Sequence, residues 1–346
     1  MATLKDLAKS LGLSVTTVSR ALGGYPEVSE QTRARVREAA ERLSYHPNPL
    51  AQKLVTGRSG LIGLITRGII DTNKDTTFMQ VALGISRELA VNDLELILRV
   101  GIEEDEIEPY RKMGSKQILD AFLINAPSPL DQRIAWLRDN KLPFVVHGRD
   151  HPRPDYPYYD LNNFKVAADA VAHLTELGHR RIALLNGPEF MEYAVERRRG
   201  FVESMAARGL SIRQGFILHG GLEETYGHRV TPQLMNLPVA ERPTAIICAS
   251  TAIAAGVLVA VRGLGLDVPR DVSIVAHDDG LPQSTLGHPV GGITVTRLAF
   301  QDACKPLAEL IVGRLKGRPL VELQINAEAP LLVRRSTMAA SGMLHG

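Results

Sequence analysis

The stretch Thr3-Leu-Lys-Asp-Leu-Ala-Lys-Ser-Leu-Gly-Leu-Ser-Val-Thr-Thr-Val-Ser-Arg-Ala-Leu22 has the pattern of two short helices joined by a tight turn. In its first half, apolar side chains recur at i, i+3, i+4 and i+7, which makes one apolar helix face. Thr3 and Asp6 have the spacing of a capping box, Gly12 ends the first helix, and Ser14 can cap the second. Two short helices around a glycine-containing turn predict a helix-turn-helix.

The second helix of this stretch carries a polar face suited to reading DNA bases. Thr16 and Arg20, four residues apart, share the face opposite its apolar side chains, and Val15 precedes them. Methyl, hydroxyl and guanidinium groups contact base edges in the major groove. Residues 1–60 contain nine Lys and Arg but five Asp and Glu, whereas the whole chain carries a net charge of +2. This basic neighbourhood suits a phosphate backbone and favours DNA binding over an ordinary helical hairpin.

A hinge is predicted after a third helix, which Ser29 should cap. Residues 46–54 are His-Pro-Asn-Pro-Leu-Ala-Gln-Lys-Leu, in which Asn48 is a helix cap followed by proline at the first helical position. A helix of about two turns is marginal in isolation, so this one should order only against a partner. A plain linker remains the alternative. Its position beside a DNA-reading unit favours a helix whose Leu54 wedges into a minor-groove step.

The composition is that of a globular protein. The chain has 346 residues, of which 45% are hydrophobic and 23% charged, which fits two or three domains. No apolar run approaches the roughly 18 residues of a membrane helix, and the first ten residues lack the apolar core of a signal peptide. Its two cysteines, Cys248 and Cys304, are far apart, which disfavours a disulfide framework or a zinc site. We therefore expect a cytoplasmic protein without membrane contact, metal or cofactor.

From residue 60 onward, short apolar runs alternate with longer amphipathic stretches. Strands are expected at residues 60–66, 94–100, 120–125, 143–147, 181–186, 215–219, 244–249, 272–276, 293–296, 321–325 and 331–333. The alternation predicts parallel βαβ units with helices on both sheet faces. Because these strands are too many for one modest sheet, we predict two doubly wound α/β lobes. A ligand cleft should lie between them at the carboxyl ends of the strands.

Five segments match, in order, the pattern of one protein family. They are the second helix at 13–22, the hinge at 46–54, Leu177-Gly-His-Arg-Arg-Ile-Ala183, Arg197-Arg-Arg-Gly-Phe201 and Val275-Ala-His-Asp-Asp279. Together they resemble the lactose/galactose repressor family of bacterial transcription regulators and cover essentially the whole chain. The resemblance implies a periplasmic-binding-protein-like effector domain. It also implies a homodimer on a pseudo-palindromic double-stranded operator, with each recognition helix in a major groove.

The resemblance also assigns the DNA contacts and the domains. The expected DNA-binding residues are Thr3, Val15, Thr16, Thr17, Ser19, Arg20, Asn48 and Leu54. The implied domains are a helix-turn-helix domain at 1–46, a hinge helix and linker at 47–59, and an effector-binding and dimerisation domain at 60–340. Within the last, lobe 1 should span about 60–158 and 291–323, and lobe 2 about 159–290 and 324–337. The chain lacks the heptad tail that makes some family members tetrameric, so we expect a dimer.

By the same resemblance, a small effector binds between the lobes. The expected effector-binding residues are Phe78, Asn125, His147, Arg149, Arg197, Ser250 and Asp278. Arg197 would hold ligand hydroxyls or a carboxylate, and Asp278 would accept hydrogen bonds from sugar hydroxyls. The sequence departs from the family at two places. Ser250-Thr251 stands where Asn-Asp is frequent, and His147-Gly-Arg149 replaces an Ile-Asp-Arg-like strand end. The latter is similar to regulators of α-galactoside or α-glucoside operons, and the residue set suits a mono- or oligosaccharide.

We therefore predict a repressor of a carbohydrate-utilisation operon whose operator affinity a saccharide controls. A sugar-binding protein of the periplasmic type would share the two lobes, but it would need an export signal and has no use for residues 1–58. A cytoplasmic sugar enzyme with an appended helical domain is a further alternative, which turnover of a bound sugar would support. The sequence contains no GxxxxGK[ST], GxSxG or HExxH motif, so we expect no catalytic residues.

Overall fold

The computed structural model describes residues 2–23, 25–43, 45, 58–66, 76–101, 105–116, 118–280 and 292–340, with side chains omitted for 76–78. The predicted contacts of Asn48, Leu54 and the Phe78 side chain lie outside the described residues, as does most of the hinge predicted at 47–59. Among the helices described, none combines the length and the apolar character needed to cross a bilayer.

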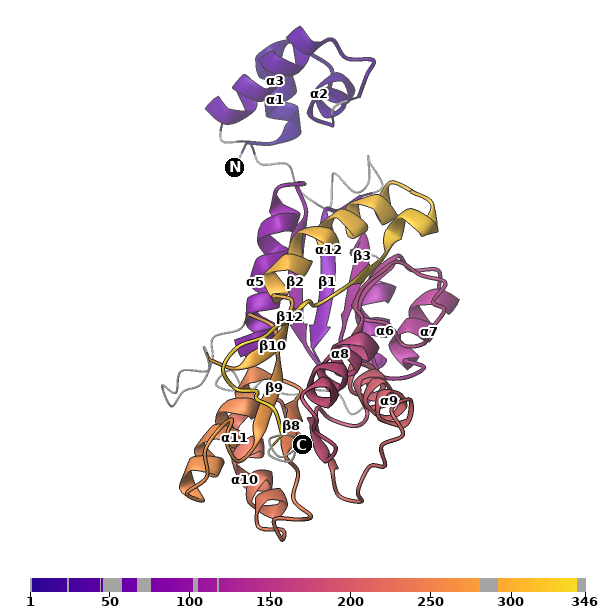
Figure 1. Cartoon of the computed structure of the whole chain (residues 1–346). Helices are drawn as coiled ribbons and strands as arrows, with labels where there is room; N and C mark the ends of the chain where they lie inside the picture. The colour runs from indigo at the N-terminus through magenta and orange to yellow at the C-terminus, as the bar shows by residue number, and fades with distance from the viewer. Residues whose placement is uncertain are drawn as a thin grey trace.

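Three helices form the N-terminal unit, which Figure 1 shows in indigo: α1 (Leu4–Leu11), α2 (Val15–Leu22) and α3 (Glu30–Arg42). Their buried side chains form one small core, in which Leu7, Val18 and Val36 are completely buried. Each of these three side chains comes from a different helix, so their packing fixes the angles between the helices. The predicted helix-turn-helix and its third helix are confirmed.

Local capping explains where these helices begin and end. The Thr3 hydroxyl accepts a hydrogen bond from the Asp6 amide, and the Asp6 carboxylate accepts one from the Thr3 amide at 2.9 Å. Gly12 ends α1 at φ 64°, a left-handed conformation that glycine adopts without strain. Ser14 and Ser29 cap α2 and α3 as predicted, each accepting a bond from an amide three residues on. These signals are all short-range, which is why the sequence displays them.

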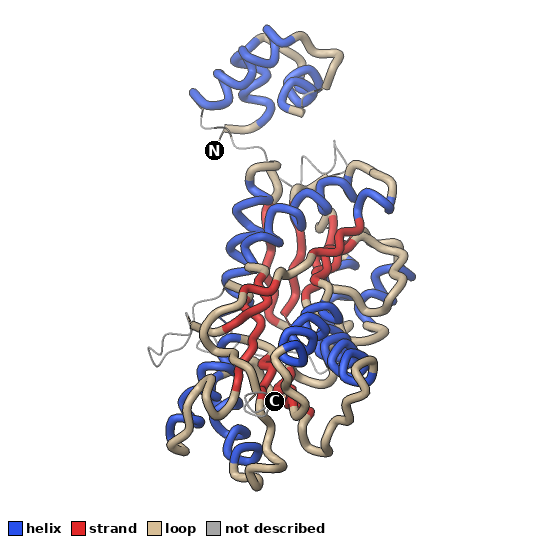
Figure 2. The backbone as a smooth tube through the Cα atoms, viewed as in Figure 1, coloured by secondary structure: helices blue, strands red, loops and turns tan. Residues whose placement is uncertain are grey.

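The first of two sheets has the strand order β11-β5-β4-β3-β1-β2, with every neighbouring pair parallel. Its strands are β1 (Leu61–Thr66), β2 (Glu95–Val100), β3 (Ala121–Asn125), β4 (Phe144–His147), β5 (Tyr158–Leu161) and β11 (Gln324–Ala327). One face packs on α5 (Thr76–Ala90) and α12 (Phe300–Leu315), and the other on α6 (Glu108–Ser115) and α7 (Gln132–Asp139). Figure 2 shows the resulting layers of helix, strand and helix.

The second sheet has the order β12-β10-β9-β8-β6-β7, parallel except for β12. Its strands are β6 (Ile182–Asn186), β7 (Ile217–His219), β8 (Ala245–Cys248), β9 (Ser273–Asp278), β10 (Thr294–Arg297) and β12 (Leu331–Leu332). Helices α8 (Asn163–Glu176) and α9 (Glu192–Ala206) cover one face, and α10 (Glu224–Met235) and α11 (Thr251–Gly263) the other. The predicted fold class, two doubly wound lobes behind a helix-turn-helix, is confirmed.

The chain crosses between the sheets three times, each time one short strand later than the predicted lobe bounds. It leaves the first sheet after β5 rather than at 158, returns after β10 rather than at 291, and leaves again after β11 rather than at 323. The expected strands at 293–296 and 321–325 overlap β10 and β11, so only the sheet that each joins was assigned wrongly. Strand β5 was not expected, because four residues are too few to show a hydrophobic period.

Two further elements have weak sequence signals. Strand β5 follows the proline-rich stretch 151–157 and was not among the expected strands. Helix α10 contains Gly227 and Pro232, both unfavourable inside helices, yet it packs tightly on α11. Tertiary packing outweighs local propensity in both cases.

Candidate functional site

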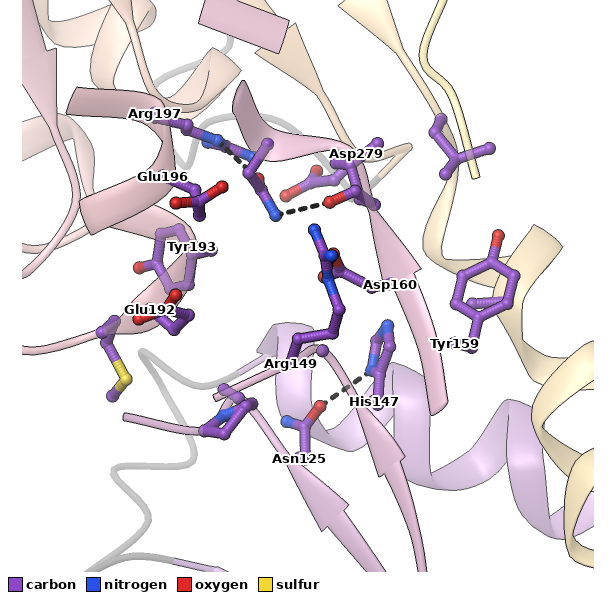
Figure 3. Close-up of a pocket in the computed structure, with 18 of the residues that line it drawn as sticks. Asn125, His147, Arg149, Tyr159, Asp160, Glu192, Tyr193, Glu196, Arg197 and Asp279 are labelled. Atoms are coloured by element: carbon purple, nitrogen blue, oxygen red, sulfur yellow. Dashed lines mark hydrogen bonds and ion pairs between the residues drawn. The ribbon is translucent and has the colours of Figure 1, made fainter. Parts of the chain in front are cut away.

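A cavity of about 270 Å³ lies between the two lobes. Its walls come from the carboxyl ends of β3, β4 and β9, from β5, and from the first turns of α9 and α12. In parallel α/β sheets ligands bind at this end of the strands. Of the predicted effector residues, the structure brings four together here, shown in Figure 3: Asn125, His147, Arg149 and Arg197. Their binding role stays a prediction.

Arg197, on α9, is held rigidly in the cavity wall although only 6% of its surface is exposed. Its Nε donates to Oδ1 of Asn163 at 2.8 Å, and its Nη1 donates to the carbonyl of Ala249 at 2.6 Å. The guanidinium also stands 5.4 Å from the centre of the Tyr193 ring. Burial lowers the pKa of Arg197, whereas Tyr193 and Asp279 act in the opposite direction. The result is a fixed, planar set of donors at the cavity.

Arg149 reaches the cavity from the loop after β4 and is paired with a carboxylate of β5. Its Nε donates to Oδ2 of Asp160 at 2.7 Å, and its guanidinium lies 5.8 Å from the Tyr158 ring centre. Burial raises the pKa of Asp160 to about 6, although Arg149 acts to lower it. The pair therefore places one cation and one carboxylate at the same wall.

His147 ends β4 and is fixed by neighbours from three elements. Its Nδ1 is 2.8 Å from Oδ1 of Asn125, so this nitrogen carries the proton. The ring meets Phe300 edge-on with centroids 5.8 Å apart and contacts Tyr159 at 6.0 Å. Burial lowers the pKa of His147 to about 4, which keeps the ring neutral near pH 7. His147 thus offers its other ring nitrogen as an uncharged hydrogen-bonding group.

The first turns of α9 supply two further carboxylates, Glu192 and Glu196, one helical turn apart. Glu196 accepts two hydrogen bonds from Arg199, at 2.9 and 2.7 Å. Burial, followed by the charges of Glu196, Asp150 and Asp160, raises the pKa of Glu192 to about 7. Burial and the neighbouring negative charges both disfavour the charged form of Glu192, so that form destabilises the fold.

Glu192→Gln is expected to stabilise the protein at pH 8 and to change stability little at pH 4.5. The folded-state pKa of Glu192, about 7, lies above the ordinary glutamate value of 4.5, so the destabilisation begins near pH 4.5 and is complete above pH 7. Thermal unfolding at the two pH values measures the difference. Glu203→Gln, on the exposed face of the same helix, is the control for losing one negative charge. An equal shift of Tm at both pH values would contradict the assignment.

The structure places two predicted effector residues elsewhere. Ser250 is buried and caps α11, accepting a hydrogen bond from the Ile253 amide at 3.1 Å. Asp278 is turned to an ion pair with Arg297 and does not line the cavity. The next residue, Asp279, lines it instead. The expected acid is thus displaced by one residue, because adjacent side chains at a strand end point in opposite directions.

Several lining residues escaped the sequence analysis, most clearly Tyr193, Glu192 and Glu196 of α9. A signal for Tyr193 was present, since it lies four residues before Arg197 and therefore on the same helix face. Other unforeseen lining residues belong to strand β5, whose existence was not predicted, or to the start of α12: Tyr159, Asp160, Leu161, Phe300 and Ala303.

The loop after β3 closes one side of the cavity and is strained. Ala126 and Leu130 have positive φ angles of 47° and 52°, which non-glycine residues adopt at a cost. The loop also touches the second lobe, since the carbonyl of Pro127 accepts a hydrogen bond from the Glu192 amide at 3.1 Å. This carbonyl meets the positive end of the α9 dipole. The contact ties the two lobes together beside the cavity.

The candidate DNA interface is the exposed face of α2. Thr16 and Arg20 are exposed, and 40% of the Val15 surface is accessible, as expected for residues that meet a partner. The other described residues that were expected to bind DNA are less open to a partner. Thr3 is exposed but serves in the cap of α1, and Thr17 and Ser19 are half-buried, with the Thr17 hydroxyl 2.8 Å from that of Ser14. Whether these residues contact DNA stays a prediction.

Comparison with known proteins finds two family matches. Residues 3–48 match the lacI family of bacterial regulatory proteins, and residues 171–337 match a periplasmic binding protein-like domain. The chain is 37% identical to the HTH-type transcriptional regulator AglR of Rhizobium meliloti, over 96% of this chain and 94% of that protein. It is 34% identical to RafR of Escherichia coli, covering 82% and 83% of the two chains. A solved structure of the regulator CelR with cellobiose superposes with a TM-score of 0.69, at 26% identity, over 97% of this chain and all of that one.

Proposed function

This chain belongs to the lacI family of bacterial regulatory proteins, and from that premise we propose that a saccharide in the inter-lobe cavity controls its affinity for operator DNA. The chain is a DNA-binding transcription regulator and not an enzyme. The proposal concerns its ligand, its assembly and the residues involved. The working place of such a regulator is the cytoplasm, where the DNA is.

The observation that carries the proposal is the chemistry of the cavity. Fixed donors at Arg197 and Arg149 face carboxylates that accept hydrogen bonds, and aromatic rings of Tyr193 and Phe300 stand beside them. Sugars present many hydroxyls that both donate and accept, and flat apolar ring faces that pack on aromatic side chains. The relative crystallised with cellobiose gives the same ligand class for a protein of this fold.

We assign residues 1–46 to DNA binding, 47–59 to the hinge and 60–340 to effector binding and dimerisation. Exposed apolar side chains on neighbouring elements of lobe 1 support a homodimer. Leu83 of α5 is 56% exposed, and Leu98 and Val100 of the edge strand β2 are 37% and 42% exposed. Exposed apolar groups clustered at a sheet edge are typical of a protein interface.

The fold provides a route from cavity to operator. A ligand held by both lobes favours one relative setting of the two sheets, and strand β1 of the first sheet directly follows the hinge. A change of that setting in a dimer would alter the separation of the two hinges. Allosteric couplings of about 1–3 kcal/mol change affinity some 5–150-fold, which is sufficient for an operon switch.

The test is operator binding by the full chain, with and without saccharides. Fragments selected from genomic DNA supply the operator, and fluorescence anisotropy at fixed salt measures affinity. We expect at least one mono- or oligosaccharide of a broad panel to change the Kd for the operator within the 5–150-fold range. Unchanged affinity across the panel removes the effector from the proposal while leaving DNA binding intact.

Arg20→Ala is expected to weaken operator binding by about 1–3 kcal/mol and to relax the base preference at one position, because a bidentate guanidinium contact is lost. Arg37→Ala, on the exposed surface of α3, removes the same charge without touching the α2 face. This control substitution should weaken binding to the operator and to a scrambled duplex by the same factor. Equal losses on both duplexes for Arg20→Ala would instead make Arg20 a phosphate contact.

A further inference from the structure

Among the described residues that line the cavity, carboxylates outnumber guanidinium groups, and we propose that the cavity accepts uncharged saccharides and rejects anionic ones such as uronates and sugar phosphates. The inference rests on the proposed function, since it specifies the ligand of the same cavity. Among the described residues, four carboxylates line the cavity, and they come from strand β5, helix α9 and the loop after β9: Asp160, Glu192, Glu196 and Asp279. The cations among the lining residues are Arg149 and Arg197, and the lining histidines are His147, His151 and His277.

Both guanidinium groups already have acceptors within the protein. Arg149 is in a 2.7 Å ion pair with Asp160, so its charge is balanced at that wall. Arg197 donates hydrogen bonds to Oδ1 of Asn163 and to the Ala249 carbonyl, at 2.8 and 2.6 Å. Donors that remain can hydrogen-bond a hydroxyl without rearrangement. An anionic group would have to compete with Asp160 for Arg149.

Two of the three lining histidines, His147 and His277, add no positive charge to offset the carboxylates. Burial lowers the pKa of His147 to about 4 and that of His277 well below its ordinary value, so both rings are neutral at pH 7. His277 is 5% exposed, and its Nδ1 is 3.1 Å from the Thr296 hydroxyl. His151 lies at the side of the cavity, 3.5 Å from the carboxylate of Asp150.

The carboxylates on α9 are placed to repel an anion. Glu192 and Glu196 follow one another along the same wall, beside Tyr193, as Figure 3 shows. Arg199 forms an ion pair with Glu196 from outside the cavity. Glu192 lies beside the loop that closes the cavity, and its backbone amide donates a hydrogen bond to the Pro127 carbonyl. Above pH 7 Glu192 is charged, and a sugar hydroxyl can donate to its carboxylate, whereas an ionised carboxylate or phosphate of a ligand cannot. Like charges brought together in a desolvated site weaken binding strongly.

Matched pairs of sugars test the inference on the full chain at pH 8, where Glu192, with its pKa of about 7, is charged. Calorimetry compares glucose with glucuronate and glucose 6-phosphate, galactose with galacturonate and galactose 6-phosphate, and includes neutral disaccharides such as maltose, melibiose and cellobiose. We expect any hexose that binds to have an affinity at least about tenfold higher than that of its own anionic derivatives. If only disaccharides bind, all four anionic sugars should fail to bind at tenfold higher concentration. The difference in affinity between neutral and anionic sugars should become smaller as the salt concentration rises.

The preference for neutral over anionic sugars should become smaller in the variants Glu192→Gln and Glu192→Gln/Glu196→Gln. It should be unchanged in Glu203→Gln, a variant on the exposed face of α9. The wild-type ratios decide the question even if the double variant fails to fold. An anionic sugar that binds as tightly as its neutral counterpart, or that alone changes operator affinity, overturns this inference and leaves the proposed function standing. If no sugar of either kind binds or changes operator affinity, the proposed function fails and this inference with it.

Discussion

Asp131→Ala is expected to lower the free energy of unfolding by about 3–5 kcal/mol, because it leaves Arg133 as an unpaired buried cation. The two side chains are 0% and 2% exposed. Asp131 accepts bonds from Nε and Nη2 of Arg133 at 2.9 and 2.8 Å, and from the Ser128 amide at 2.9 Å. The variant therefore loses an ion pair and the anchor of the strained loop after β3. Urea unfolding measures the change.

The matched control is Asp155→Ala. Asp155 forms an ion pair with Arg138 at 3.2 Å, but the two side chains are 61% and 50% exposed. Exposed pairs contribute no more than about 1 kcal/mol, so this variant should unfold near the wild-type midpoint. A similar small loss for Asp131→Ala would show that the buried pair does not hold the loop. Because Ala126 and Pro127 of that loop line the cavity, Asp131→Ala should also weaken saccharide binding.

Gly256→Ala is expected to destabilise the second lobe by about 3 kcal/mol, the upper end of the overpacking range. A methyl group at Gly256 would stand 1.9 Å from the Glu224 carbonyl oxygen and 2.6 Å from the His228 amide nitrogen. Both are backbone atoms of α10, so the two helices would have to separate. The effect should appear as a lower unfolding midpoint.

Gly263→Ala provides the comparison within the same helix. A methyl group at Gly263 would meet nothing within 4 Å, and alanine is the better helix former by up to about 1 kcal/mol. This variant should therefore match or slightly exceed wild-type stability. If Gly256→Ala behaved like Gly263→Ala, the close approach of α10 and α11 would not depend on the missing side chain.

The sequence was most informative where structure depends on near neighbours. The capping box at Thr3, the caps at Ser14 and Ser29, and the turn at Gly12 all involve contacts within a few residues. The alternation of strands and helices from residue 60 is also local, because burial of a whole sheet face imposes a period on each element. Helix α10 and strand β5 escaped prediction because glycine, proline and short length hide that period.

The candidate site was predicted only in part, for a geometric reason. Asn125, His147 and Arg149 were expected from the family resemblance, and they lie together because strand ends meet at one edge of a parallel sheet. The choice between Asp278 and Asp279 depends on which way a single side chain points, and that is decided by the ion pair with Arg297. The sequence around Asp278 gives no sign that its partner is Arg297, 19 positions further along the chain.

The amino-acid sequence alone determined the helix-turn-helix, the two-lobed α/β class and the family, since each is written in local patterns or in motifs of fixed order. Only the tertiary structure decided the balance of charge in the cavity. The carboxylates come from three separate parts of the chain, and they meet only because two sheets face each other. They are Asp160 of β5, Glu192 and Glu196 of α9, and Asp279 after β9. Electrostatic interaction depends on distance in space and on burial, and neither quantity can be read along a chain.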